Sequence, residues 1–190
     1  MKSFDQEVDE AVAILRKGKV MLYPTDTIWG IGCDASSSRA VSKLYRIKKR
    51  QENKSLIALI DDIERLEQYV KKVPPLAYDL IKSASNPITI VYPGARKLAK
   101  NMIAADGSVA IRISSHPFCQ AVVKKFGKPI ASSSANISGE PTAISYSQIS
   151  TKIKSTVDHI VGLYQDEVKH PKASSIIKLE PDGDFTIIRP

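Results

Sequence analysis

The fold of this chain is decided by residues 20–35, which read VMLYPTDTIWGIGCDA. The run from Val20 to Tyr23 is apolar and stops at a proline, a pattern that predicts a short buried strand. Thr25-Asp26-Thr27 follows as a polar loop. The chain is then apolar again as far as residue 35, although two glycines interrupt the run. This stretch therefore predicts a buried strand that ends in a loop of hydrogen-bonding side chains.

Helix-like and strand-like segments alternate through the rest of the chain. Continuous apolar runs are typical of strands in a sheet that is covered on both faces. Residues 180–183 (Glu-Pro-Asp-Gly) predict a hairpin between the last two strands, so we expect a mixed sheet of about seven strands. Helices are expected over about 5–17, 39–49, 62–71, 74–84, 116–126 and after Tyr146, and strand-like runs lie at 20–23, 56–60, 88–92, 109–113, 129–131, 158–162, 174–179 and 184–188.

The length of 190 residues predicts a single domain, 1–190, that buries a core without a disulfide or a metal. No apolar run approaches the roughly 20 residues needed to span a bilayer. The first ten residues lack the apolar segment of a secretory signal, so we expect a cytoplasmic location and no membrane partner. Cys33 and Cys119 lie among apolar residues, which predicts buried and inert thiols. The three histidines are scattered without the spacing of metal ligands.

The positive charge of the chain is concentrated in one segment. The formal net charge is +8, and residues 39–54 contain seven basic residues against one acidic residue, a net charge of +6. Such a segment can meet nucleic acid, an anionic membrane or a phosphorylated small molecule, and charge alone does not decide between them. Four of the basic residues share one face of the predicted helix and the loop after it: Arg39, Lys43, Arg46 and Arg50.

Polar side chains collect at the expected ends of the apolar strands, at residues 24–27, 48–54, around Arg112 and at 132–136. Their hydroxyl, amide and guanidinium groups bind anions, but they include no nucleophile paired with a base. Neither GxxxxGK[ST] nor GxGxxG occurs, so a phosphate site would depend on lysine, arginine and backbone donors. Residue patterns alone leave two classes open: an anion-binding enzyme and a basic nucleic-acid-binding domain.

Read in order, the polar motifs resemble those of the YrdC/TsaC family, the L-threonylcarbamoyladenylate synthases. The resemblance covers about residues 8–189, and Ser134-Ala-Asn136 separates the chain from the YciO-like branch, which lacks this motif. The chain departs from the family pattern at Ser55, Leu59 and Ser114, and Trp29 replaces a usual tyrosine. The matching segments are 23–35 (family PTDTxYGLGxDA), 47–56 (IKxRxxxKPL), 86–89 (PGPxT), 109–112 (VxxR), 133–141 (TSANxSGxP), 174–177 (SSTI) and 187–189 (ILR).

The resemblance implies an α+β fold of the three-layer α/β type, with a strongly twisted mixed sheet around a basic concave groove and helices on both faces. It implies an enzyme, a nucleotidyltransferase that converts L-threonine, bicarbonate and ATP with Mg²⁺ into L-threonylcarbamoyladenylate and pyrophosphate. The product would serve the threonylcarbamoyl (t6A) modification of adenosine 37 in tRNA, through a downstream threonylcarbamoyl transferase complex. A double-stranded RNA or tRNA-binding module that uses the same groove is the alternative.

The resemblance also implies roles for individual residues. No protein ligand for Mg²⁺ is assigned, although the carboxylate of Asp26 could help to place the ion. The residues expected at the nucleotide are Lys48, Arg50, Lys54, Ser108, Asn136 and Arg189. Those expected at threonine are Thr27, Arg112, Ser134 and Ser174, and the catalytic set is Lys48, Arg50, Ser134 and Asn136.

Overall fold

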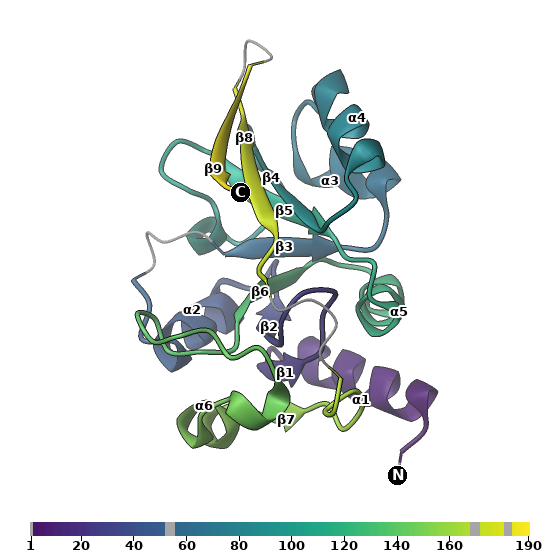
Figure 1. The fold of residues 1–190 in the computed structure, drawn as a ribbon, viewed down its shortest axis with the longest axis vertical. Coiled ribbons are helices and arrows are strands. Elements are labelled where there is room, and N and C mark those ends of the chain that lie inside the picture. Colours follow the sequence, from purple (N-terminus) through teal and green to yellow (C-terminus); the bar gives the residue numbers. More distant parts are fainter. Residues whose placement is uncertain (1, 52–55, 168–171, 181–183) are drawn as a thin grey trace.

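The computed structural model describes residues 2–51, 56–167, 172–180 and 184–190. Within these residues, nine strands form one mixed sheet (Figure 1). The strand order is β7-β1-β2-β6-β3-β5-β4-β8-β9. The pairs β1–β7, β3–β5 and β4–β8 are parallel, whereas the other neighbours are antiparallel. The strands are β1 Met21–Tyr23, β2 Gly30–Asp34, β3 Ile57–Ile60, β4 Ile88–Tyr92, β5 Val109–Ile113, β6 Ile130–Ser134, β7 His159–Ile160, β8 Ser175–Leu179 and β9 Phe185–Arg189.

The mixed sheet and the C-terminal hairpin β8–β9 are confirmed, but the expected strand number of about seven was too low. Gly30 and Gly32 lie inside β2 and weaken its apolar pattern, while β7 has two residues and is too short to show alternation. Residues 132–134, which were expected in a loop, extend β6 because they pair with β2. The hairpin turn at 181–183 lies outside the described residues.

Helices form where the apolar spacing predicts them, although the expected helix over 62–71 is a 3-10 turn (Ile63–Arg65) followed by a short α-helix. The first helix begins with a capping box, in which Ser3 and Gln6 each accept a hydrogen bond from the other's backbone N–H. In the described part of the chain, no helix has the length and apolar character needed to cross a membrane. The helices are α1 Phe4–Arg16, α2 Ser38–Ile47, α3 Leu66–Tyr69, α4 Pro75–Ser83, α5 Pro117–Phe126 and α6 Thr151–Thr156.

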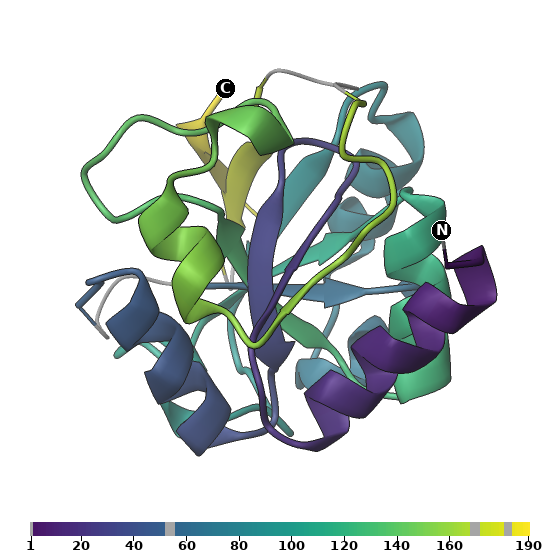
Figure 2. The same cartoon turned by 90° about the horizontal axis from the view of Figure 1, so that it is seen from below.

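Two hydrophobic cores cover the two faces of the sheet. Helices α1 and α5 lie side by side on one side of the sheet, and α2 and α6 lie on the other (Figure 2). Along β3, for example, Leu59 packs in the core beneath α1 and α5, whereas Ala58 packs in the core with α2, α3, α4 and α6. Alternate strand residues therefore face different layers, as the pleat of a sheet requires.

The face beneath α1 and α5 is closely packed near β1. A Cβ atom at Gly32 would lie 2.7 Å from the carbonyl oxygen of Ala131 and 2.9 Å from the Tyr23 ring, so this position in β2 requires glycine. Farther along the same face the side chains change from apolar to polar: on β6, Ile130 lies in the core and Ser132 lines a cavity. This uncovered part of the sheet face carries the candidate site.

Candidate functional site

A cavity of about 440 Å³ lies over the open part of the sheet face. Seven of its lining residues carry a serine or threonine hydroxyl, three are arginines, and none of the lining residues that the structure describes is a carboxylate. The cavity brings together six of the residues expected at the site: Thr27, Arg50, Arg112, Ser134, Ser174 and Arg189. Its lining is cationic and rich in donors, which suits an anionic ligand.

The cavity draws on the expected strand ends, and it also extends along the strands themselves. Ala110 and Arg112 are two residues apart on β5, and both line the cavity because they project from the same face. Ser132 and Ser134 do the same on β6. The cavity therefore combines residues within β5 and β6 with residues at strand ends and in the adjoining loops, such as Thr27, Ser174 and Arg189.

Arg112 is the most constrained cation of the cavity, with 6% of its surface exposed. Its Nη2 lies 3.3 Å from Asp26 Oδ1, and its Nη1 donates to Thr27 Oγ1 at 3.2 Å. Its Nε is shielded from solvent and has no hydrogen-bond partner among the described residues. A buried, fixed guanidinium with an unused donor can bind a carboxylate or a phosphate of a ligand.

The loop before β2 and the segment after β5 hold Arg112 in place from both sides. Thr25 Oγ1 donates to the carbonyl of Ile28 at 2.7 Å and lies 3.1 Å from Thr27 Oγ1. Ser114 donates its hydroxyl to Asp26 Oδ1 at 2.9 Å. Asp26 is therefore occupied by Arg112 and Ser114, which leaves it poorly placed to serve as a Mg²⁺ ligand.

A second part of the wall comes from the C-terminal hairpin. Ser174 Oγ lies 2.7 Å from Thr89 Oγ1, and both residues are buried. Arg189 donates from Nε and Nη2 to the carbonyl of Ser174 at 2.9 and 2.6 Å. Burial and, to a lesser extent, the neighbouring Arg112 lower the pKa of Arg189, consistent with the two arginines sharing one cavity.

Lys48 ends α2, and 1% of its surface is exposed. Its Nζ donates to the carbonyl oxygens of Ser134 and Asn136, the latter at 2.6 Å, and its own carbonyl accepts from Ser138 N at 2.9 Å. Burial and, to a lesser extent, Arg50 lower its pKa to about 7. Lys48 thus fastens the Ser134–Asn136 segment to α2 and does not line the cavity; its expected contact with phosphate stays a prediction.

The other expected nucleotide residues differ in their placement. Arg50 lines the cavity, and burial lowers its pKa, although a guanidinium remains charged at physiological pH. Asn136 Nδ2 donates to the carbonyls of Ile137 and Glu140, at 3.1 and 2.7 Å, and does not line the cavity. Ser108 lies outside the cavity and donates its hydroxyl to Asp106 Oδ1. Lys54 lies outside the described residues.

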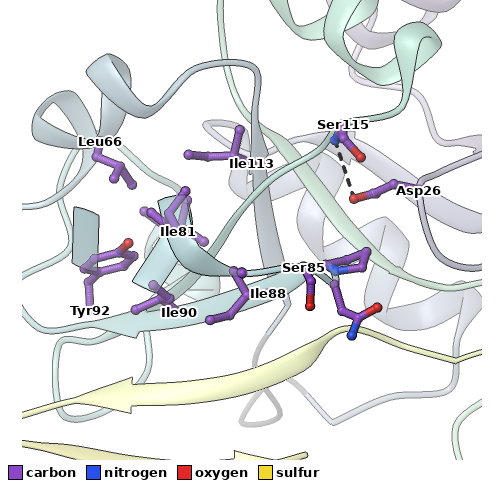
Figure 3. Close-up of a pocket in the computed structure, with 13 residues that line it drawn as sticks. Asp26, Leu66, Ile81, Ser85, Ile88, Ile90, Tyr92, Ile113 and Ser115 are labelled. Atoms are coloured by element: carbon purple, nitrogen blue, oxygen red, sulfur yellow. Dashed lines mark hydrogen bonds between the residues drawn. The ribbon is translucent and has the colours of Figure 1, made fainter. Parts of the chain in front are cut away.

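A second cavity, of about 350 Å³, opens on the other face of the sheet between β4, β5 and α4 (Figure 3). Its inner wall is apolar, with Ile88, Ile90 and Ile113 among the lining residues. Asp26, which bonds to Ser115 N at 3.5 Å, is the one carboxylate among its described lining residues. A cavity with this lining does not suit an anion, so we place the candidate site in the larger, arginine-lined cavity.

One contact at the cavity, between Tyr23 and Ser132, was not expected from the sequence, although residues 132–136 were expected at the site. Tyr23 donates its hydroxyl to Ser132 Oγ at 2.6 Å, and burial raises the pKa of Tyr23, so the phenol stays neutral and orients Ser132 within the cavity. The predicted loop at 132–136 concealed this contact. The strand period of two, counted back from Ser134, is the signal that could have revealed it.

The burial of both cysteines is confirmed, and so is the shielding of their thiols. Both side chains are fully buried, and burial raises the pKa of Cys33 well above its usual range and that of Cys119 to about 12. Neither thiol can supply a thiolate at neutral pH.

The fold and the cavity together define a class: an α/β protein with a mixed sheet, one face of which carries a cavity lined by arginines and hydroxyl groups that suits an anionic ligand. The family model Sua5_yciO_yrdC, described as "Telomere recombination", matches residues 13–190. Similar curated proteins include the threonylcarbamoyl-AMP synthase of Pseudoalteromonas translucida, which is 36% identical over 160 residues, 83% of each chain. That of Xanthomonas euvesicatoria is 33% identical over 82% of this chain and 84% of the relative. The chain belongs to the Sua5/YciO/YrdC family.

Solved structures support the same assignment of the fold. Sua5 from P. abyssi complexed with L-threonine superposes with a TM-score of 0.86 at 26% identity. All of this chain is covered, but the chain spans 55% of that longer protein. E. coli YciO shares the fold, with a TM-score of 0.85 at 23% identity over 100% of this chain and 90% of YciO.

Proposed function

We propose that this chain is a threonylcarbamoyl-AMP synthase that joins L-threonine, bicarbonate and ATP into L-threonylcarbamoyladenylate and releases pyrophosphate. The observation that carries the proposal is the convergence of Arg50, Arg112 and Arg189 with hydroxyl groups in one cavity whose described lining has no carboxylate. The activity is that named for its curated relatives, and the relative from P. abyssi was solved with L-threonine. We further propose that the product serves t6A formation on tRNA in the cytoplasm, through a downstream transferase.

The proposed reaction places modest chemical demands on the protein. The threonine amine captures carbon dioxide or bicarbonate as a carbamate, a carbamate oxygen attacks the α-phosphorus of ATP, and pyrophosphate leaves. Positioning and neutralisation of charge supply most of the rate in such a transfer. Arg112 and Thr27 hold threonine, Arg50 and Arg189 face the phosphates, and the Ser134–Asn136 segment lies between them. Because the described lining has no carboxylate, Mg²⁺ is expected to enter bound to the triphosphate.

The reaction is tested by incubating the chain with ATP, Mg²⁺ and bicarbonate and measuring pyrophosphate. Release is expected to depend on L-threonine and to fall at least 10-fold when L-serine or L-alanine replaces it. If pyrophosphate release is the same without L-threonine, the proposed synthase activity is wrong.

Substitution of Arg50 is expected to impair the use of ATP. Arg50→Ala removes a partly buried guanidinium from the cavity wall, and a hydrogen bond to a charged group contributes roughly 1.5–3 kcal/mol, so kcat/KM for ATP should fall at least about 10-fold. The matched control is Arg46→Ala, which removes an exposed arginine of α2 four residues earlier in the chain and should leave turnover within about twofold. Near-normal turnover of Arg50→Ala would exclude the residue from the site.

The alternative function, an RNA-binding module, would depend on basic residues that do not line the cavity. Arg39 and Arg46 are exposed on α2, whereas Lys43 is paired with Asp158 at 2.6 Å. Binding to several phosphates gives a steep fall of affinity with salt. A salt titration of RNA binding, with millimolar ATP as competitor, shows whether RNA binds and whether it shares the cavity.

A further inference from the structure

Helix α1 and the edge strand β7 lie at the opposite end of the sheet from the C-terminal hairpin (Figure 1), and they carry three side chains whose donor atoms could ligate a metal ion. Glu7 and Glu10 are three residues apart on α1 and share one helix face. His159 begins β7. One donor atom from each of the three side chains lies within 4.8 Å of the other two.

The two inner donor atoms are aimed at each other but are not hydrogen-bonded. Glu7 is 4% exposed, and its Oε1 accepts from Gly162 N at 3.1 Å, which fixes the carboxylate. Glu7 Oε2 and His159 Nε2 are both shielded from solvent and lack a hydrogen-bond partner among the described residues. Leaving two buried polar atoms without a hydrogen bond is costly, and a cation bound by both would offset this cost.

The separation of these atoms fits a shared metal ion. Glu7 Oε2 lies 3.6 Å from His159 Nε2, which is too long for a hydrogen bond. Two ligand atoms that each lie about 2.0–2.1 Å from a tetrahedral Zn²⁺ are separated by roughly 3.4 Å. The two carboxylates would offset the charge of the ion, and an imidazole favours Zn²⁺ over Mg²⁺, which prefers oxygen ligands alone.

We propose that Glu7, Glu10 and His159 form a Zn²⁺ site that fastens α1 to the edge of the sheet. Glu7 and His159 are 152 residues apart in the sequence. The ion would therefore link the N-terminal helix to a strand of only two residues. Glu10 Oε2 accepts from Lys2 Nζ at 2.6 Å, and this exposed pair would have to loosen when the carboxylate turns to the metal. The site is separate from the arginine-lined cavity and is independent of the proposed reaction.

The test is a Zn²⁺ titration of the untagged, metal-stripped chain against a chromophoric chelator. One equivalent is expected to bind saturably, and His159→Gln and Glu10→Gln should each weaken binding at least 10-fold while the fold, followed by circular dichroism, is retained. Asp5→Asn removes an exposed carboxylate from the same helix and should change the affinity by less than twofold. Binding that is absent, or that survives in both ligand variants, would overturn the proposal.

A second measurement identifies the ligand directly. Long-range ¹H–¹⁵N spectra of the histidine rings should show that Zn²⁺ shifts the Nε2 resonance of His159. A shift confined to another histidine would overturn the assignment. So would a His159 ring that titrates as a simple ion pair with Glu7 and does not respond to Zn²⁺.

Discussion

Replacing Arg112 by lysine should raise the KM for L-threonine by roughly 10- to 150-fold and change the KM for ATP by less than about threefold. The lysine keeps the positive charge opposite Asp26 but loses the planar fork that donates to two partners at once. Loss of one charge-assisted hydrogen bond of about 1.5–3 kcal/mol gives the stated factor. The measurement is initial-rate kinetics of pyrophosphate release with each substrate varied in turn.

A neutral replacement at the same position tests the structural role of the arginine. Arg112→Met should destabilise the fold by about 3–5 kcal/mol, because Asp26 would remain buried without its cationic partner. The double variant Arg112→Met with Asp26→Asn removes both charges and should recover much of this stability, although not the affinity for threonine. Urea denaturation measures both effects.

The matched control is Arg65→Lys. Arg65 also donates to a carboxylate, Asp61 at 2.6 Å, but it is not a lining residue of the arginine-lined cavity. Its substitution should leave both KM values unchanged. If Arg112→Lys raises the KM for ATP instead of that for threonine, the arginine belongs to the nucleotide and the assignment of the two substrates within the cavity is reversed.

The residues that were predictable from sequence are those whose local pattern is unusual. Arg112 breaks an apolar strand, and a buried charge of that kind needs a partner or a ligand. The helices and most strands follow from apolar spacing, which depends on nearby residues alone. By contrast, β2 was weakly predicted because the glycines that its tight packing requires also lower its apolar content.

The contacts that were not predictable join residues distant in the chain. Thr89 meets Ser174 because β4 pairs with β8, an arrangement that no single segment encodes. Glu7 and His159 meet only when β7 joins the edge of the sheet. The individual polar residues could thus be selected from the sequence, but their grouping into one cavity or one cluster required the tertiary fold.

The contacts of Lys48 likewise required the tertiary fold, and substitution of this lysine should have a large effect on catalysis. The family resemblance implies a direct phosphate contact for Lys48, which stays a prediction; in the structure its Nζ is buried against the backbone of Ser134 and Asn136. Lys48→Met leaves both carbonyls without their donor, so the segment should shift within the cavity. We expect kcat to fall at least 100-fold, with a loss of about 1–2 kcal/mol in the free energy of unfolding, since removal of the buried cation offsets part of the cost.

The matched control is Lys49→Met, the same change at the adjacent, exposed position. It should leave kcat within about twofold and stability within about 0.5 kcal/mol. A Lys48→Met enzyme whose kcat remains near normal would show that the segment holds its position without the lysine.

The lowered pKa of Lys48 should make the free energy of unfolding increase with pH. The folded protein holds this proton with a pKa of about 7, and an unfolded lysine holds it with its ordinary pKa of 10.5. The unfolded state therefore binds more protons between these two pH values. The free energy of unfolding should therefore gain a contribution that rises as the pH increases from about 7 to about 10.5, and Lys48→Met should remove it. Urea denaturation at pH 7.5 and 9.5 measures the difference, and equal slopes in the two proteins would contradict the lowered pKa.

Binding of the nucleotide should reverse this shift. A triphosphate beside Arg50 and the Ser134–Asn136 segment places negative charge near the buried amine, which favours its protonated form. At pH 8 a group with a pKa of about 7 is largely neutral, so binding of MgATP should take up roughly 0.9 of a proton if the bound pKa exceeds 9. Calorimetric titrations in two buffers of different ionisation enthalpy measure this uptake, which Lys49→Met should retain and Lys48→Met should lose. Binding without proton uptake in the unmodified chain would mean that the phosphates lie too far from Lys48 to act on it, and the catalytic role of the lysine would then be confined to holding the segment.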